Sequence, residues 1–221
     1  PNARLPGDDG ALRGEEEGKE GGRERGRQEG KEGRLERGAT LPSGLLPAPS
    51  PIEITVALLT VSDRAHSGVY EDKSGPAMAH VLTSEAFLSK GLRVRVVQSD
   101  IVPDDIPQIQ QKICIWADEL KVDAIFTSGG TSFAPRDLTP EAVRPLIDKE
   151  APGMVWRIME VGTKHTPFAV LSRPVAGVRG GTFIVTLPGS PKAVKENLDT
   201  LLPLLPKVFG LLKTATCDHK A

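Results

Sequence analysis

The sequence predicts an α/β fold of three layers, in which helices cover both faces of a mostly parallel sheet. Two segments, Ile54–Val61 and Thr182–Leu187, are almost continuously apolar and rich in β-branched residues. Such runs are typical of strands that are buried on both faces. Helical patterns of roughly 10–15 residues separate the strand-like segments, and this alternation indicates right-handed βαβ units.

The first half of the predicted domain alternates strands with amphipathic helices. After the first strand and a polar loop, Ser74 is expected to cap a helix with apolar residues at helical spacing. Leu92–Val97 is predicted as the second strand. The next predicted helix begins at Pro103-Asp104-Asp105, and its apolar stripe runs over Ile106–Leu120. Val122–Thr127 is predicted as the third strand.

The next predicted helix, Glu141–Lys149, is opened by Thr139 as N-cap and by the proline that follows it. A second helix is expected over Met154–Val161. Thr166–Pro174 is predicted as an extended segment, and Ala176–Gly181 as a glycine-rich turn.

The domain is expected to end in the strand Thr182–Leu187 and a long helix, Lys192–Leu212. Ser190 followed by proline is a typical helix start. Pro203 and Pro206 are expected to kink this helix or to end it early.

Composition divides the chain into three parts. Residues 1–51 are dominated by Gly, Glu and Arg and then by Pro and Ser, so we expect a disordered arm and a linker. A degenerate transit peptide is the alternative, although such peptides are poor in acidic residues. Residues 52–213 are predicted to form the folded domain, and residues 214–221 a loose tail.

Several classes of function are disfavoured by composition. The net charge of -1 and the aromatic content of 4% argue against a nucleic-acid surface, and no apolar run reaches the ~20 residues of a membrane span. The two cysteines, Cys114 and Cys217, lack the spacing of a disulfide framework or a zinc site. This pattern suits a reducing compartment, and we expect a cytoplasmic location.

The stretch after the third predicted strand has the composition of a phosphate-binding loop. Gly129 and Gly130 allow a sharp turn and close approach of N–H groups to a ligand, and Thr131 and Ser132 add hydroxyls. The nearby anion Asp137 suits such a site if a divalent metal is bound as well. The alternative is an ordinary glycine turn followed by a surface Arg-Asp pair.

Four segments are expected to leave the sheet at its carboxyl edge, where ligands bind in open α/β sheets. They are Ser62-Asp63, Pro103-Asp104, Gly129–Asp137 and Pro188–Pro191. Helix N-termini at this edge attract anions, and the carboxylates could supply oxygen ligands to Mg²⁺. The alternative is that Asp63 and Asp104 are ordinary helix caps.

Five motifs follow one another along the predicted domain. They are Val61–Lys73, Pro103-Asp104, Gly129–Glu141 with its Arg136-Asp137 pair, Leu171-Ser172-Arg173, and Pro188-Gly189-Ser190-Pro191. In this order they resemble the motifs of the molybdopterin adenylyltransferase family, which includes the G domains of gephyrin. The resemblance covers about Ile54 to Leu212.

The resemblance implies an enzyme that transfers AMP from Mg²⁺-ATP to the terminal phosphate of molybdopterin and releases pyrophosphate. It implies that Asp104 and Asp137 are the essential acids and hold the Mg²⁺. It also implies a homotrimer and a possible molybdenum-insertase domain or partner protein. The implied substrate-binding residues are Ser62, Asp63, Gly129, Gly130, Thr131, Ser132, Thr139, Ser172, Arg173, Pro188, Gly189 and Ser190.

One residue departs from the family pattern, because Ser132 stands where the family usually has a fourth loop glycine. If this position requires a positive φ, serine would strain the loop by on the order of 1 kcal/mol. Two other functions are considered as alternatives for the domain. One is a catalytically weak pterin-binding scaffold in the same pathway, and the other is a nucleotide- or phosphate-binding domain outside it.

Overall fold

A computed structural model of the chain describes residues 50–217, and side chains up to residue 214. The predicted arm up to residue 49 and residues 218–221 lie outside the described residues. The described chain forms one mixed sheet in the order β2-β1-β3-β6-β5-β4. The strands are β1 (Ile52–Val61), β2 (Leu92–Val102), β3 (Ala124–Ser128), β4 (Lys149–Glu150), β5 (Ala176–Arg179) and β6 (Thr182–Leu187).

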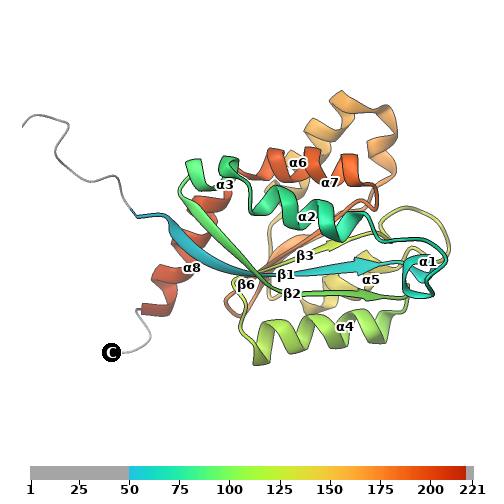
Figure 1. Ribbon diagram of the computed structural model, residues 1–221, viewed down its shortest axis with the longest axis horizontal. Coiled ribbons are helices and arrows are strands. Elements are labelled where there is room, and N and C mark those ends of the chain that lie inside the picture. The colour runs from blue at the N-terminus through green and yellow to red at the C-terminus, as the bar shows by residue number, and fades with distance from the viewer. Residues whose placement is uncertain (1–49, 218–221) are drawn as a thin grey trace, which may run out of the picture. The chain divides into compact units, whose positions relative to one another are not determined.

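The four strands β2, β1, β3 and β6 run parallel, whereas β5 is antiparallel to β6 and to β4. Helices lie above and below this sheet (Figure 1). One face is covered by α2 (Ser74–Leu82), α3 (Glu85–Ser89), α6 (Pro152–His165), α7 (Pro191–Leu201) and α8 (Leu205–Cys217). The other is covered by α4 (Ile106–Cys114), the π-helical turn Ile115–Glu119 and α5 (Thr139–Val143).

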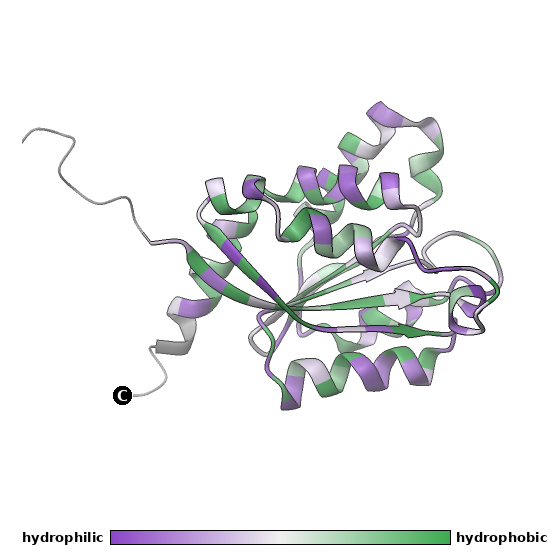
Figure 2. Cartoon of the chain, viewed as in Figure 1, coloured by the Kyte–Doolittle hydropathy of each residue, from purple (hydrophilic) through white to green (hydrophobic). Residues whose placement is uncertain are grey.

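The alternation of side chains along β1 explains why the sheet has two covered faces. Ile54, Val56 and Leu58 belong to the core beneath α2 and α7, whereas Leu59 and Val61 belong to the core beneath α4. Apolar colouring accordingly runs along the central strands and the inner sides of the helices (Figure 2). The predicted three-layer, mostly parallel fold is confirmed.

The strand order reverses between β1 and β3. The chain leaves β1 toward β2 on one side, then crosses back through α4 to β3 on the other. In such sheets the crevice at the carboxyl ends of the two central strands is the usual ligand site. The short helix α1 (Asp63–His66) lies at this edge, directly after β1 (Figure 1). The sequence predicts a polar loop there, with Asp63 and Asp104 as helix caps in the alternative interpretation. The N-caps are instead Ser62 for α1 and Asp105 for α4.

Two predicted helix caps are wrong in detail. Helix α2 is capped by Asp72, whose Oδ1 accepts hydrogen bonds from the N–H groups of Ser74 (2.8 Å) and Gly75 (3.1 Å). Ser74 is the first residue of the helix, and its Oγ donates instead to the carbonyl of Gly189 (2.7 Å). Thr139 is likewise the first residue of α5, with Leu138 in the N-cap position.

Three predicted segments differ from the structure between the third and last strands. The helix predicted over Glu141–Lys149 ends at Val143, because Pro145 disfavours a regular helix before it, and a 3₁₀ turn and β4 follow. The segment predicted as extended contains a 3₁₀ helix, Pro167–Leu171. Most of the predicted turn Ala176–Gly181 is strand β5, and its last two glycines form the hairpin turn to β6.

Three elements in particular are longer than predicted, and the first is helix α6, which is expected over Met154–Val161 and spans Pro152–His165. Strand β2 continues to Val102, because its polar residues at 98–100 lie at the sheet edge and are partly exposed. The closing helix is interrupted as predicted, with α7 ending at Leu201 and α8 beginning at Leu205, but α8 continues to Cys217. Among the described residues, no helix has the length and apolar character needed to cross a bilayer.

Candidate active site

The loop after β3 can be built only from glycine at two positions. Gly129 has a φ of +95°, and a Cβ there would lie 2.2 Å from the carbonyl oxygen of Val61 on β1. Gly130 has a φ of +61°, and its Cβ would lie 2.4 Å from Thr139 Oγ1 and 2.8 Å from Asp104 Oδ1. Both the positive φ and the missing Cβ are therefore needed for this loop to pass between its neighbours.

Thr139 fixes the glycine loop through two hydrogen bonds. Its side chain is fully buried, its Oγ1 donates to the Gly129 carbonyl (2.9 Å), and its N–H donates to the Gly130 carbonyl (3.0 Å). The Gly129 N–H donates to the carbonyl of Leu187 (3.1 Å) and so is committed to the sheet. Among the described residues, no hydrogen-bond acceptor lies within reach of the N–H groups of Gly130 and Thr131, which follow it in the loop.

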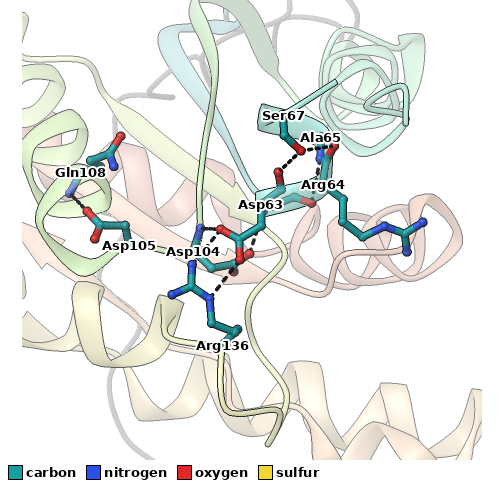
Figure 3. A network of polar contacts seen from close by, with 9 residues as sticks. Asp63, Arg64, Ala65, Ser67, Asp104, Asp105, Gln108 and Arg136 are labelled. Carbon is teal, nitrogen blue, oxygen red and sulfur yellow. Dashed lines mark hydrogen bonds and ion pairs between the residues drawn. The ribbon is translucent and has the colours of Figure 1, made fainter. Parts of the chain in front are cut away.

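Asp63 and Asp104 connect the ends of β1 and β2. The Asp63 N–H donates to Asp104 Oδ2 (2.9 Å), and the Asp104 N–H donates to Asp63 Oδ1 (3.0 Å). Arg136, from the glycine loop, donates to both oxygens of Asp63 through Nε (3.0 Å) and Nη2 (2.8 Å). Figure 3 shows the three side chains meeting from three different segments. Arg136 therefore pairs with Asp63, and not with its neighbour Asp137 as in the alternative of a surface Arg-Asp pair.

The second oxygen of Asp104 is the most unusual polar atom of the site. Asp104 is 8% exposed, and its Oδ1 has no hydrogen-bond partner. Burial raises the pKa of Asp104, and the charges of Asp63 and Asp137 raise it further. In contrast, the hydrogen bonds from Arg136 lower the pKa of Asp63. The two neighbouring carboxyls therefore have opposite shifts, because one is paired with a cation and the other is buried.

Asp137 closes the glycine loop on itself. Its Oδ2 accepts a hydrogen bond from the Ser132 N–H (2.7 Å). Arg173 holds the same turn from outside by donating to the carbonyls of Ser132 (2.9 Å) and Asp137 (2.7 Å), and it also forms an ion pair with Glu141. Among the described residues, no donor bonds to the other oxygen of Asp137, and this residue lines two pockets.

Two pockets meet at this loop. The larger, of about 410 Å³, extends from the loop to α6 and α7 and includes apolar side chains such as Ile158 and Phe168. The smaller, of about 190 Å³, lies between the ends of β1 and β3. Gly130, Asp137 and Gly189 line both pockets. A ligand that spans the two would therefore pass directly over the glycine loop.

Comparison with known proteins agrees with this geometry. The family model described as a probable molybdopterin binding domain matches residues 57–207. The chain belongs to this molybdopterin-binding family. A molybdopterin adenylyltransferase of Helicobacter pylori is 37% identical over 159 residues, which is 72% of this chain and 88% of that protein.

The family fold is also seen in solved structures. The molybdopterin biosynthesis enzyme MoaB of Thermus thermophilus superposes with a TM-score of 0.66 at 43% identity, over 73% of this chain and 97% of that one. Gephyrin of Dictyostelium discoideum is 41% identical over 165 residues, which is 73% of this chain. The chain spans 23% of the length of that gephyrin, so it corresponds to one part of a larger relative.

Most of the site residues predicted from the sequence line the two pockets of this molybdopterin-binding domain. Asp63, Thr139 and Arg173 do not line them, and their side chains hold the loops in place instead. The smaller pocket is lined by Ser62, Asp104 and Gly129. The larger pocket is lined by Thr131, Ser132, Ser172, Pro188 and Ser190. Both pockets are lined by Gly130, Asp137 and Gly189.

Four polar residues of the smaller pocket are absent from the predicted site residues, namely Thr60, Tyr70, Ser74 and Ser128. Tyr70 shares a hydrogen bond with Ser62 (3.2 Å), Ser74 donates to Gly189, and Ser128 ends strand β3. Ser128 carries the clearest signal, since it is a hydroxyl residue at the end of a buried strand and directly precedes Gly129.

The residues present fit a magnesium ion that is shared with a substrate. The described residues contain no group of three or more His, Cys, Asp or Glu that could hold a metal by themselves. However, Mg²⁺ is usually bound by one or two carboxylates together with substrate phosphates and water. Asp104 has a buried, unpaired oxygen, and the charge of Asp137 acts on it. This pair matches that ligand set.

Proposed function

We propose that this domain transfers AMP from Mg²⁺-ATP to the terminal phosphate of molybdopterin, giving adenylylated molybdopterin and pyrophosphate. The observation that carries the proposal is the position of Asp137 and the glycine loop on the border between two pockets of different character. Adenylyl transfer needs two substrates whose phosphates meet at one point. The relatives named molybdopterin adenylyltransferase support the same reaction.

The larger pocket suits an organic ring system. It combines apolar walls with a few polar groups, including the Ser172 hydroxyl and the N-terminal turn of α7, which is capped by Ser190. Ser172 donates to Thr131 Oγ1 (3.3 Å) and thereby orients a hydroxyl of the loop. The smaller pocket, of about 190 Å³, is lined mainly by hydroxyls, carboxylates and glycines, which suit phosphate groups and a metal ion better than a ring system.

The chemistry requires positioning more than a strong base. A phosphate oxygen of molybdopterin attacks the α-phosphorus of ATP, the bond to the bridging oxygen breaks, and pyrophosphate leaves with its electrons. Near pH 7 the attacking phosphate is already largely a dianion, because its second pKa is about 6. Asp104 and Asp137 would hold the Mg²⁺, which neutralises charge on the phosphates. The free N–H groups of the glycine loop would orient phosphate oxygens.

The same proposal includes an assembly and a location. We propose a homotrimer, as the family resemblance implies. A contact surface is supported by large apolar side chains that are exposed on α6 and the adjoining 3₁₀ helix, namely Trp156, Phe168 and Val170. Such residues commonly mark contact surfaces. Sedimentation of the purified protein measures the oligomeric state directly.

We also propose a cytoplasmic location, and a molybdenum-insertase domain or protein as the partner that receives the product.

Single-turnover release of pyrophosphate tests the reaction. The native protein is expected to release pyrophosphate only when Mg²⁺-ATP and molybdopterin are both present. Asp137→Ala should reduce release by about 100-fold or more at an unchanged fold. Asp105→Asn is the matched control, because Asp105 is a neighbouring acid that only caps α4 through the Gln108 N–H.

Two outcomes would replace the proposal. Tight binding of molybdopterin without pyrophosphate release by the native protein would indicate a pterin-binding scaffold. Binding of nucleotide without any binding of molybdopterin would indicate a nucleotide-binding domain outside this pathway.

A further inference from the structure

Nearly every hydroxyl that lines the smaller pocket already has a protein partner. Thr60 Oγ1 donates to Asp72 Oδ2 (2.8 Å), and Ser74 Oγ donates to the Gly189 carbonyl. The hydroxyls of Ser62 and Tyr70 share a hydrogen bond with each other. These four residues are therefore committed to the walls of the pocket.

Ser128 is the exception among the described residues of this pocket. Its side chain is fully buried, and its Oγ has no hydrogen-bond partner. Asp104 lines the same pocket, and its Oδ1 is also without a partner. Leaving a buried polar group unpaired costs about 1–3 kcal/mol, and more for a charged group. Two such atoms in the wall of one small pocket indicate that a ligand completes their hydrogen bonding or coordination.

The chemistry of the two atoms restricts the ligand. Ser128 offers a hydroxyl whose O–H can donate to an acceptor such as a phosphate oxygen. Asp104 Oδ1 offers a carboxylate oxygen, so it needs a cation or a bound water. Gly130 leaves space beside this oxygen, since a Cβ at that position would lie 2.8 Å from it. A magnesium-bound polyphosphate carries an acceptor and a cation side by side and fits a pocket of about 190 Å³.

We propose that Ser128 is a substrate-binding residue whose hydroxyl donates to the magnesium-bound polyphosphate of the nucleotide in the smaller pocket, beside Asp104. This deepens the proposed adenylyl transfer and rests on it for the identity of the nucleotide. It assigns the pyrophosphate end of the nucleotide to the pocket between β1 and β3, and leaves the larger, more apolar pocket for ring systems.

Strand β3 supplies a matched control. Thr127 precedes Ser128 and is also fully buried with an unpaired hydroxyl, but it does not line the smaller pocket. Successive residues of a strand point to opposite faces of the sheet, so the two hydroxyls lie on opposite sides. Ser128→Ala and Thr127→Val each remove one unpaired hydroxyl from the same strand at little change in volume.

Binding of Mg²⁺-pyrophosphate by titration calorimetry is the first test, because it requires no turnover. Ser128→Ala is expected to weaken this binding by about 10- to 100-fold, the range for a lost hydrogen bond to a charged group. Thr127→Val is expected to leave it unchanged. Thermal unfolding without ligand should show both variants to be as stable as the native protein or more so, since neither hydroxyl has a partner to lose.

The outcomes separate this inference from the proposed function. Equal binding of Mg²⁺-pyrophosphate by native protein and Ser128→Ala overturns the role of Ser128, even if the native protein turns over. Weaker binding only of molybdopterin in the same variant overturns the assignment to the nucleotide. A loss confined to Ser128→Ala supports the inference even if no adenylyl transfer is detected. If Ser128→Ala does not fold, Ser128→Cys, with its weak donor, replaces it under the same criteria.

Discussion

Asp63 and Asp104 each donate their backbone N–H to the carboxylate of the other, at 2.9 and 3.0 Å. This reciprocal pair joins the carboxyl ends of β1 and β2 at the edge where the site lies. It uses one oxygen of Asp104, while Arg136 and the backbone occupy both oxygens of Asp63. The second oxygen of Asp104 is consequently held in a fixed position without a partner, at a cost in stability that a ligand can offset.

The first prediction is that Asp104→Asn stabilises the protein without ligand. Asparagine keeps an oxygen for the Asp63 N–H and removes a buried charge whose Oδ1 is unpaired. The expected gain in the free energy of unfolding is about 1 kcal/mol near pH 7. Denaturant unfolding measures it, and a loss of stability would contradict the view that Asp104 is retained for ligand binding.

The gain in Asp104→Asn should also depend on pH. The pKa of Asp104 is raised in the folded protein above its ordinary 3.8, so the native state favours the protonated form. Its favourable contribution is present below pH 3.8 and is lost as the pH rises through the folded-state pKa. The stability difference between variant and native protein should therefore be small in acid and grow toward neutral pH. A difference that is constant with pH would contradict this.

The second prediction concerns the neighbours of Asp104. The charge of Arg136 lowers the pKa of Asp104, and the charge of Asp63 raises it. Arg136→Gln should therefore raise the pKa of Asp104, whereas Asp63→Asn should lower it. Carboxyl ¹³C chemical shifts followed over pH measure both directions. Shifts of the same sign in the two variants would show that a rearranged loop, and not the charges, controls this carboxyl.

The strands and the glycine loop were predictable because their signals are local. β-branched apolar runs mark the buried strands, and Gly129 and Gly130 mark a turn that other residues cannot form. The caps were less predictable, since a serine and an aspartate two residues apart compete for one helix start. Asp72 caps the helix and Ser74 does not, because the Ser74 hydroxyl donates to the carbonyl of Gly189, 115 residues away in sequence.

The partners of the charged residues could not be predicted from local patterns. Arg136 is 73 residues from Asp63, and Arg173 is 41 residues from Ser132, yet these contacts fix the loop. Adjacency in sequence suggests that Arg136 and Asp137 act together. The folded chain instead directs Arg136 to the end of β1 and Asp137 to its own loop. Which polar atoms remain unpaired, such as Ser128 Oγ, depends on all of these contacts at once.

The third prediction is that Ser132→Gly gives no gain in stability. The position does not have a positive φ, and the serine Oγ accepts a hydrogen bond from the Ala134 N–H (3.2 Å), so serine is not strained here. Glycine would lose this bond and add freedom to the unfolded chain, at a cost of about 0.5–1 kcal/mol. Thermal unfolding measures the change. A higher melting temperature for Ser132→Gly would show that serine does strain the loop.

The fourth prediction compares two glycine substitutions. Gly129→Ala places a Cβ 2.2 Å from the Val61 carbonyl oxygen, in a backbone with φ +95°, so the loop or strand β1 must move. We expect a loss of about 3 kcal/mol or more in the free energy of unfolding. Gly181→Ala is the control, because no atom lies within 4 Å of its Cβ and its φ is ordinary. It should be neutral or slightly stabilising, since alanine restricts the unfolded chain.

Denaturant unfolding and binding of Mg²⁺-pyrophosphate should be measured on both glycine variants. In Gly129→Ala the strand β1, which carries Ser62 and Asp63 at its end, and the loop that carries Asp137 cannot keep their spacing. Binding should therefore fall even under conditions where the variant remains folded, and stay unchanged in Gly181→Ala. Native-like stability in Gly129→Ala would mean that the close approach of Gly129 to Val61 is not required for the fold, and the site would have to be assembled by the side-chain contacts alone.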